Sequence, residues 1–339
     1  MKIKYLPLVL LCGMIVLSCD NGATSTNGTD DGSNPNGSWR DATISTFNGD
    51  IYGFAYGNDT FVAVGGSTGN PQIARSTNNG TSWTVINIES QTGSGNNPSA
   101  IAFGNGKFIT MGSLLQAHWS TDGAGWTDVG SYYIGQCIIH NDGVFIIGRD
   151  SGVDRLLDTS DTWESVNMGS IYHDTRIRNI AYGEGTFLTV GGVVFNNNQR
   201  MARSTNKGAS WTEVTDSTLG TILGNNNIQS MAYGEGTFIA VGDGGKVVRS
   251  TDKGESWTEI TSATFGTSDF RTIAYGKGIF IAGGDDGKMV SSTDNGSTWT
   301  IVSNNTTGDH IHHIFFGNDR FLATGWTPGG GKIAILTVN

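Results

Sequence analysis

Proline is scarce in this chain, whose 339 residues include only 5 prolines beside 51 glycines. Collagen-like chains combine their glycine with abundant proline, and disordered chains lack the apolar residues that make up 37% of this one. Nine tryptophans add to that apolar content. The composition therefore excludes a collagen-like or wholly disordered protein and favours a folded chain with many tight turns.

Charge is also sparse, and positive charge most of all. Charged residues make up 15% of the chain, and 30 acidic residues against 20 basic ones give a formal net charge of −10. Beyond residue 4 the sequence contains no cluster of lysine and arginine that could neutralise a row of phosphates. We therefore expect no nucleic-acid partner.

The apolar run at the N-terminus is too short to span a membrane. It covers residues 5–17, follows Lys2 and Lys4, and has the length of a signal-peptide core. It ends in Val-Leu-Ser-Cys, which resembles a bacterial lipoprotein cleavage site with Cys19 as the residue that takes the lipid. We predict that residues 1–18 are removed on export. An ordinary signal peptide with a chance cysteine is the alternative.

The residues after the cleavage site support an anchored, exported protein. Residues 19–36 contain no large apolar side chain, which predicts a flexible tether. Loss of the two leader lysines lowers the formal charge from −10 to −12, so the acyl chains alone would hold the protein at an anionic membrane. Of three cysteines, Cys12 lies in the leader and Cys19 carries the lipid, which leaves Cys137 without a disulfide partner. We expect a lipoprotein of the cell membrane, or of the outer membrane and cell surface.

Repetition is what the sequence has in abundance. A phrase of an apolar residue, Ala, an aromatic residue, Gly, any residue, Gly, any residue and Phe recurs seven times at intervals of 37 to 51 residues, with exchanges in the first, third and seventh copies. Its phenylalanines are Phe61, Phe108, Phe145, Phe187, Phe238, Phe280 and Phe321. Each unit divides into four short strands between glycine-containing turns, as at 273–275, 279–282, 288–291 and 299–302. Four strands in about 43 residues are typical of a propeller blade.

The two ends of the chain carry complementary parts of one unit. Residues 37–40 match the fourth-strand phrase, whereas the seventh unit stops after its third strand at 332–338. Pairing these two segments would complete a blade and remove an open sheet edge. We predict an all-β fold over residues 37–339: a single, monomeric, seven-bladed β-propeller of four-stranded antiparallel blades, closed by the N-terminal fourth strand.

A second phrase, Ser-Thr-Asp/Asn-x-Gly-x-Ser/Thr-Trp, follows most units. Its residues include Ser76, Asn78, Gly80, Trp83, Asp122, Trp126, Asn206, Trp211, Asp252, Trp257, Asp294 and Trp299. The phrase resembles the Asp box of the bacterial neuraminidase repeat, and the unit resembles those of sialidase-like and photosystem II assembly-factor-like propellers. This resemblance implies a hairpin between the third and fourth strands of a blade. We interpret its Asp or Asn as the acceptor for backbone N–H groups of the turn and its glycine as a residue with positive φ. Its tryptophan would cover the turn with apolar surface.

The same resemblance makes glycoside hydrolysis the alternative function. A sialidase-like site needs three arginines, a Tyr–Glu pair and an acidic Asp, and the early Phe/Tyr-Arg-Ile-Pro signature of that family is absent. Arg75, Arg203 and Arg249 directly precede boxes and are interpreted as structural third-strand residues. We therefore expect a non-catalytic protein that needs no cofactor.

A cluster of histidines near the C-terminus raises the question of a metal. His310 and His312 are two residues apart and would face the same side of a strand, whereas His313 would face the other. A third ligand is uncertain even with Asp309 nearby, so we expect solvated side chains and no metal. Cys137 aligns with small residues of other units and is expected to be buried rather than reactive.

One aligned position can hydrogen-bond in all seven units. It lies two residues before the apolar start of the first-strand phrase and is occupied by Tyr52, Ser99, Gln136, Arg178, Gln229, Arg271 and His312. First strands line the axis of a propeller, so we expect these residues, named the mouth ring, to surround the channel mouth on the face of the variable inter-blade loops. The competing interpretation is that they only hydrate the channel.

We expect a binding or assembly platform in the envelope for a protein partner, with a glycan as the second option. Arg178 and Arg271 would give this acidic protein a local positive site suited to a carboxylate, on an acidic peptide segment or an acidic sugar. The alternative is that each arginine pairs with a neighbouring loop acid such as Asp174 or Asp269, which would neutralise the site.

Overall fold

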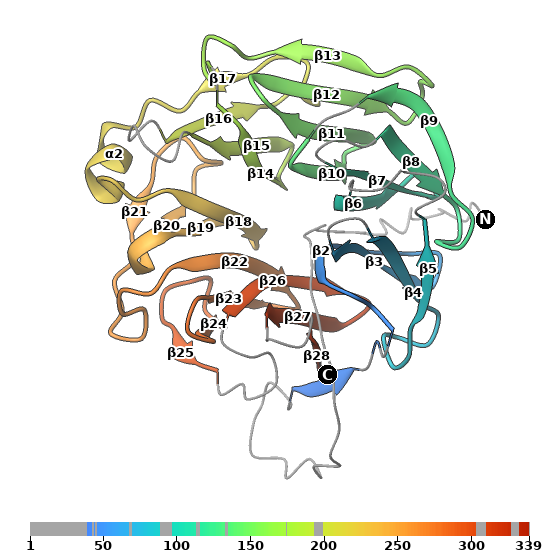
Figure 1. The fold of residues 1–339 in the computed structure, drawn as a ribbon. Coiled ribbons are helices and arrows are strands. Elements are labelled where there is room, and N and C mark those ends of the chain that lie inside the picture. The colour runs from blue at the N-terminus through green and yellow to red at the C-terminus, as the bar shows by residue number, and fades with distance from the viewer. Residues whose placement is uncertain are drawn as a thin grey trace, which may run out of the picture.

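The computed structural model describes residues 39–42, 44, 46–67, 70–88, 97–112, 116–132, 135–173, 175–192, 199–302, 310–326 and 332–338. The predicted leader and tether, with Cys19, lie outside these residues. Within them the chain forms seven four-stranded antiparallel sheets, which stand around a central axis (Figure 1). The prediction of a seven-bladed β-propeller is confirmed.

The first six blades each take four consecutive strands. Blade 1 contains β2 (Asp50–Gly57), β3 (Thr60–Ser67), β4 (Asn70–Ser76) and β5 (Thr84–Asn87). Blade 2 contains β6 (Pro98–Gly104), β7 (Lys107–Gly112), β8 (Gln116–Ser120) and β9 (Thr127–Tyr132). Blade 3 contains β10 (Cys137–Asn141), β11 (Val144–Arg149), β12 (Gly152–Leu157) and β13 (Glu164–Asn167). Blade 4 contains β14 (Ile177–Gly183), β15 (Thr186–Gly191), β16 (Arg200–Ser204) and β17 (Thr212–Glu213).

The later blades follow the same order. Blade 5 contains β18 (Ile228–Gly234), β19 (Thr237–Gly242), β20 (Val247–Ser250) and β21 (Thr258–Glu259). Blade 6 contains β22 (Phe270–Gly276), β23 (Ile279–Gly284), β24 (Met289–Ser292) and β25 (Thr300–Ile301). Its first strand is longer than the predicted 273–275 and its fourth is shorter than 299–302, because the inner strand is buried between neighbours while the outer one is exposed.

Blade 7 is built from both ends of the chain, as predicted. It contains β26 (His310–Gly317), β27 (Arg320–Trp326) and β28 (Lys332–Thr337), and β1 (Arg40–Ala42) is its fourth strand. β1 runs antiparallel to β28, with Arg40 opposite Ile335 and Ala42 opposite Ile333. The sheet therefore joins segments almost 300 positions apart in the sequence and closes the ring.

The glycine that follows the aromatic residue of the repeated phrase is explained by the next blade. A Cβ on Gly234 would lie 2.3 Å from the ring of Tyr275, and one on Gly183 would lie 2.2 Å from the ring of Tyr233. The other side of the Tyr275 ring packs against Phe280 of its own blade, with centroids 4.5 Å apart. The rings of Tyr233 and Tyr275 thus each contact the phenylalanine of their own blade and a neighbouring backbone that has no side chain.

Polar side chains join neighbouring blades at the end of the propeller that carries the first-to-second-strand turns and the box turns. One contact spans each of the seven junctions, and the residue pairs are Asn58 with Thr121, Asn105 with Asp158, Lys207 with Asp142, Lys253 with Glu184, Asn295 with Glu235, Lys277 with Asp319, and Asn318 with Asn79. We call this end the box face. Its polar groups hold the ring of blades together.

A short helix interrupts the β architecture between blades 4 and 5. α2 (Ser217–Leu223) lies in the connection between β17 and β18. Asp216 caps it by accepting from the backbone N–H of Thr218, and also accepts from the backbone N–H of Trp257 at 2.9 Å. Among the described residues no helix has both the length and the apolar character that a membrane crossing requires.

Candidate ligand-binding mouth

The mouth-ring residues share a backbone feature that explains why they project. In six of the seven first strands the pairing with the second strand skips one residue, and the skipped residues are Tyr52, Ser99, Arg178, Gln229, Arg271 and His312. Gln136, the seventh, directly precedes β10 and donates its backbone N–H to Gly148. The extra residue of a β-bulge is unpaired in the ladder, so its side chain is free to be aimed away from the sheet.

In blades 4, 5 and 6 the residue after the bulge ties neighbouring blades together. Asn179 Oδ1 accepts from the backbone N–H of Met231, and Ser230 Oγ accepts from that of Ile273. In the same way Thr272 Oγ1 accepts from the backbone N–H of Ile314 at 2.9 Å. These bonds fix successive first strands relative to one another just beside the mouth.

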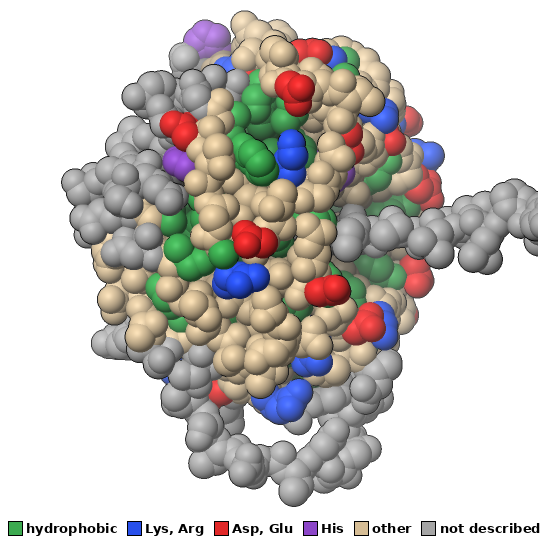
Figure 2. All heavy atoms as spheres, turned by 90° about the vertical axis from the view of Figure 1, so that its right-hand side faces the viewer, with side chains coloured by type: hydrophobic (Ala, Val, Ile, Leu, Met, Phe, Trp, Pro, Cys, Tyr) green, Lys and Arg blue, Asp and Glu red, His purple; other side chains and the backbone are tan. Residues whose placement is uncertain are grey.

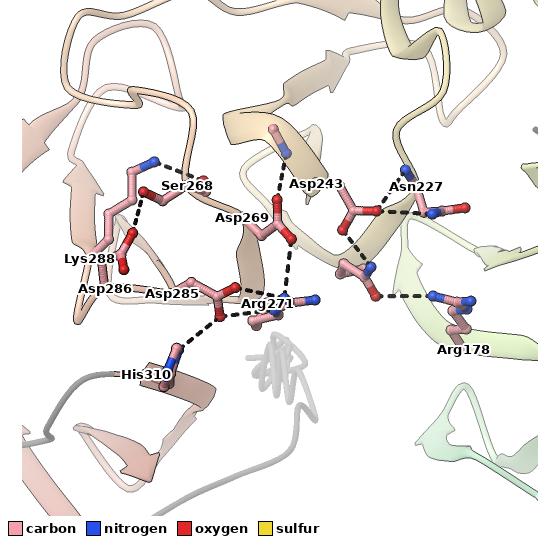
Figure 3. A network of polar contacts seen from close by, with 12 residues as sticks. Arg178, Asn227, Asp243, Ser268, Asp269, Arg271, Asp285, Asp286, Lys288 and His310 are labelled. Carbon is pink, nitrogen blue, oxygen red and sulfur yellow. Dashed lines mark hydrogen bonds and ion pairs between the residues drawn. The ribbon is translucent and has the colours of Figure 1, made fainter. Parts of the chain in front are cut away.

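A polar network runs along the mouth from blade 4 to blade 5 (Figure 3). Arg178 Nη1 donates to Gln229 Oε1 at 3.3 Å, and Gln229 Nε2 donates to Asp243 Oδ1 at 2.7 Å. The other oxygen of Asp243 accepts from the backbone and side-chain nitrogens of Asn227. Asp243 lies in the turn between β19 and β20, so this turn shares the mouth end of the propeller with the ring residues.

The network continues into blades 6 and 7, where the arginine is held by carboxylates instead of an amide. Arg271 donates through Nε and Nη2 to both oxygens of Asp285, at 3.1 and 2.7 Å, and through Nη2 to Asp269 at 3.1 Å. His310 Nδ1 lies 3.2 Å from Asp285 Oδ1. The hydrogen bonds from Arg271 hold the pKa of Asp285 below its ordinary value, and Asp285 raises the pKa of Arg271 in turn. Gly244 N–H donates to Asp269, which links this group to the blade 5 turn.

The two mouth arginines therefore differ. Arg271 is paired with two carboxylates, those of Asp285 and of the expected Asp269. The alternative interpretation, in which neighbouring acids neutralise the arginine, therefore applies to Arg271. Arg178 contacts a neutral amide, and no carboxylate of the described residues lies within ion-pair distance of it. Asp174, the other acid considered for pairing, lies outside the described residues. We expected Arg178 and Arg271 to form one positive site together. The structure instead pairs Arg271 with two carboxylates and holds Arg178 through the neutral amide of Gln229.

Three further ring members, Tyr52, Gln136 and Ser99, carry no charge. Tyr52 is 42% exposed and Gln136 is partly exposed, while Ser99 Oγ lies 3.4 Å from the backbone oxygen of Met111. The two cationic members of the mouth ring thus come from blades 4 and 6.

The histidine cluster does not follow simple strand alternation. His312 is the extra residue of the bulge, and its ring centroid lies 6.2 Å from that of His310. Loss of solvent around the ring lowers the pKa of His312, and burial lowers the pKa of His313 well below its usual range. No group of three potential metal ligands gathers among the residues that the structure describes, and Asp309 lies outside them.

Cys137 lies in the wall between blades 3 and 4. Its thiol is directed at the backbone oxygen of Ile177, 3.8 Å away, and burial raises its pKa to about 12. A thiol that stays protonated is a poor nucleophile.

The box residues build their own turns on the box face. In the sixth blade Ser292 Oγ accepts from Gly296 N–H, Asp294 Oδ1 accepts from Thr298 N–H, and Trp299 Nε1 donates to Gly296 O. Asn78 does the same in blade 1, accepting from Ser82 N–H at 2.9 Å.

The arginines before the boxes reach the next blade. Arg75 donates to the backbone oxygen of Asp122, Arg203 pairs with Glu255 and Arg249 contacts Ser297. These three arginines thus join blades and do not converge on one point.

The sequence analysis did not predict the role of Asp243 and Asp285, which hold the mouth ring from the second-to-third-strand turns. Each follows a glycine and sits in a turn motif, Gly-Asp-Gly-Gly or Gly-Asp-Asp-Gly, which is the only sequence signal for them. On the side of the molecule seen in Figure 2, acidic and basic side chains lie interspersed among neutral ones, without a patch of either sign.

Comparison with known proteins supports the fold. A profile of the DUF6242 beta propeller domain matches residues 162–311. No curated protein matches the chain. The relation to Asp-box proteins therefore remains a resemblance of motifs.

Solved structures extend this likeness to almost the whole chain. YCF48 bound to D1 peptide superposes with a TM-score of 0.68 at 16% identity, over 94% of this chain and 98% of that one. YCF48 from Cyanidioschyzon merolae gives 0.68 at 13% identity, over 88% and 98%. PorZ, a surface component of the type-IX secretion system of Porphyromonas gingivalis, gives 0.58 at 9% identity, over 89% of this chain and 38% of PorZ. At these identities the likeness is one of fold.

Proposed function

We propose that this chain is a lipid-anchored protein of the cell envelope whose propeller is a non-catalytic platform for binding or assembling a protein partner at the mouth ring. The observation that carries the proposal is the mouth: six of the seven ring side chains project from bulges on a scaffold that is cross-linked at every blade junction. Variable polar groups on a rigid framework are the usual setting of a binding site. The structure of a similar propeller, YCF48, with D1 peptide is in line with a peptide or protein ligand.

Glycoside hydrolysis is supported less well. Tyrosine–glutamate pairs do occur, as Tyr233 with Glu184 and Tyr275 with Glu235, but they lie on the box face. Burial, reinforced by the glutamate, raises the pKa of each tyrosine to about 12, which makes the phenol a weaker nucleophile rather than a stronger one. Turnover of any member of a glycoside panel by the purified protein would overturn the non-catalytic proposal.

The role of the mouth is tested by charge reversal. We expect the full-length protein in detergent to cross-link an envelope protein, which is then identified and purified for a direct binding measurement. Arg178→Glu with Arg271→Glu should abolish that binding while the circular dichroism spectrum stays unchanged. Lys253→Glu with Lys277→Glu changes the charge equally on the box face and should leave binding intact. Equal binding by both double variants would place the partner elsewhere.

The anchor is tested separately by phase partitioning. We propose that Cys19 carries the lipid because it directly follows the short apolar leader. Cys19→Ala should then move the protein from the detergent phase to the aqueous phase of a Triton X-114 separation. Retention of the variant in the detergent phase, at the level of the wild type, would refute the lipoprotein proposal and leave the mouth proposal untouched.

A further inference from the structure

We propose that Arg178 is the residue of the mouth ring that binds a carboxylate of the protein partner, and that Gln229 and Asp243 are the residues that position it. This inference rests on the proposed function and names the chemistry of the same site. It assigns different roles to two arginines that occupy equivalent positions in their blades.

The first step is the orientation of Gln229. A carboxylate can only accept hydrogen bonds, so the 2.7 Å contact to Asp243 fixes the amide nitrogen of Gln229 on that side. The amide oxygen must then face Arg178, which is where it accepts from Nη1. Asp243 is itself held by two nitrogens of Asn227, so the relay is anchored to the start of β18.

The second step is that this relay holds Arg178 without neutralising it. An amide oxygen carries no formal charge, and of the five N–H groups of the guanidinium only Nη1 has a hydrogen-bond partner among the residues that the structure describes. The remaining donors can form the two parallel bonds by which arginine pairs with a carboxylate. Arg271 has already used Nε and Nη2 on Asp285 and Asp269, so the same edge is occupied there.

The third step concerns the class of ligand. The partly exposed side chain of Gln136 can donate to and accept from the C=O and N–H groups of a peptide backbone. A sugar ring is commonly held by an open aromatic face. The exposed aromatic member of the mouth ring, Tyr52, belongs to blade 1, three blades away from Arg178 in blade 4. The ring chemistry therefore favours a carboxylate carried by a protein segment.

A blocked triglutamate peptide is the probe, titrated at low salt into the full-length protein in detergent, with blocked triglutamine as the neutral comparison. Arg178→Gln should weaken triglutamate binding at least about tenfold. Arg176→Gln removes an equal charge two residues away, from an exposed arginine that already pairs with Asp150 at 3.3 Å, and should change the affinity less than about twofold. Equal losses from the two variants would overturn the assignment of Arg178.

The positioning role is tested at Gln229. Gln229→Glu keeps the size of the side chain but places a carboxylate against Arg178, so it should weaken binding more than Gln229→Ala, although alanine removes more contacts. A greater loss from the alanine variant would show that Gln229 is merely structural. Thermal unfolding checks that each variant is folded, and the Arg178 and Arg176 comparison stands by itself if a Gln229 variant is not.

Failure of this inference can be told apart from failure of the proposed function. If glucuronate binds the wild type and triglutamate does not, the peptide carboxylate is wrong as the ligand class. If neither binds but charge reversal at the mouth still abolishes capture of the envelope partner, the carboxylate inference falls and the platform proposal stands. If charge reversal leaves capture unchanged, the platform proposal fails at the mouth.

Discussion

At the scale of single residues, the repeated phrase contains residues required by contacts between blades as well as residues required by the turns. The glycine after the aromatic residue is not needed for an unusual backbone angle at Gly234, whose φ is not positive. It is needed because the Tyr275 ring occupies the space of its Cβ. A sequence shows the glycine, but the reason for it comes from a residue 41 positions away in the chain.

Gly234→Ala should therefore destabilise the protein by about 1–3 kcal/mol, because the added methyl forces the Tyr275 ring or the backbone to move. Gly220→Ala is the matched control: it lies inside α2 with nothing within 4 Å of the added Cβ, and should be neutral or slightly stabilising. Urea unfolding measures both. Equal stability of the two variants would contradict the packing argument, and adding Tyr275→Ala should remove part of the Gly234→Ala penalty.

The acidic boxes make stability depend on pH. Hydrogen bonds from the side chain and backbone of Thr298 lower the pKa of Asp294 to about 2. Because the pKa is lower in the folded state than in an unfolded chain, the carboxylate stabilises the fold above about pH 4, and this contribution is lost as the pH falls toward 2.

Asp294→Asn should flatten the decline of unfolding free energy between pH 4 and pH 2 while leaving the fold intact, since Asn78 builds the same turn with an amide. The reverse exchange, Asn206→Asp, should make the decline steeper. Urea titrations at several pH values measure both slopes. Parallel pH profiles for the wild type and both variants would show that the box carboxylates do not contribute.

At the scale of strands, the repeat predicted the blade order and singled out one aligned polar position, but it did not predict the bulges on which six of these seven residues lie. A bulge is a property of the backbone register, and residues as different as Tyr52, Ser99 and Arg271 occupy it. The pairing of Arg271 with Asp285 was equally hidden, because it joins a first strand to a turn 14 residues later whose position depends on packing. An alignment of the units identifies the seven ring residues. It does not show that Arg271 is paired with carboxylates while Arg178 contacts a neutral amide.

Thr272→Val tests the bonds beside the bulges. Its hydroxyl accepts from the buried N–H of Ile314, so the isosteric change leaves that donor unpaired and should cost about 1–3 kcal/mol. Thr212→Val, on the exposed outer strand β17, should change stability by no more than about 0.5 kcal/mol. If urea unfolding gives the same small effect for both, the bonds between first strands do not hold the mouth.

At the scale of the whole molecule, the propeller is closed by a strand of only three residues. Trp39 packs against the hydrophobic cluster of blades 6 and 7, Ala42 is buried, and β1 covers the outer edge of β28. The sequence predicted this closure because each end carried the part of a unit that the other lacked. The polar contact from Asn318 to Asn79 at the junction of blades 7 and 1 adds a second link at the same seam.

Two truncations measure what the closure contributes. Deleting residues 20–35 removes a segment before the propeller that has no large apolar side chain, and should leave the unfolding free energy nearly unchanged. Deleting residues 39–44 as well removes β1 and the Trp39 contact and uncovers the edge of β28, which should cost about 3 kcal/mol or more. The longer deletion should also raise the tendency to aggregate, since an unpaired edge strand can pair with another chain. Equal midpoints of urea unfolding for the two truncations would mean that the ends of the chain do not stabilise a common blade, and that the seam between blades 7 and 1 is held by its side-chain contacts alone.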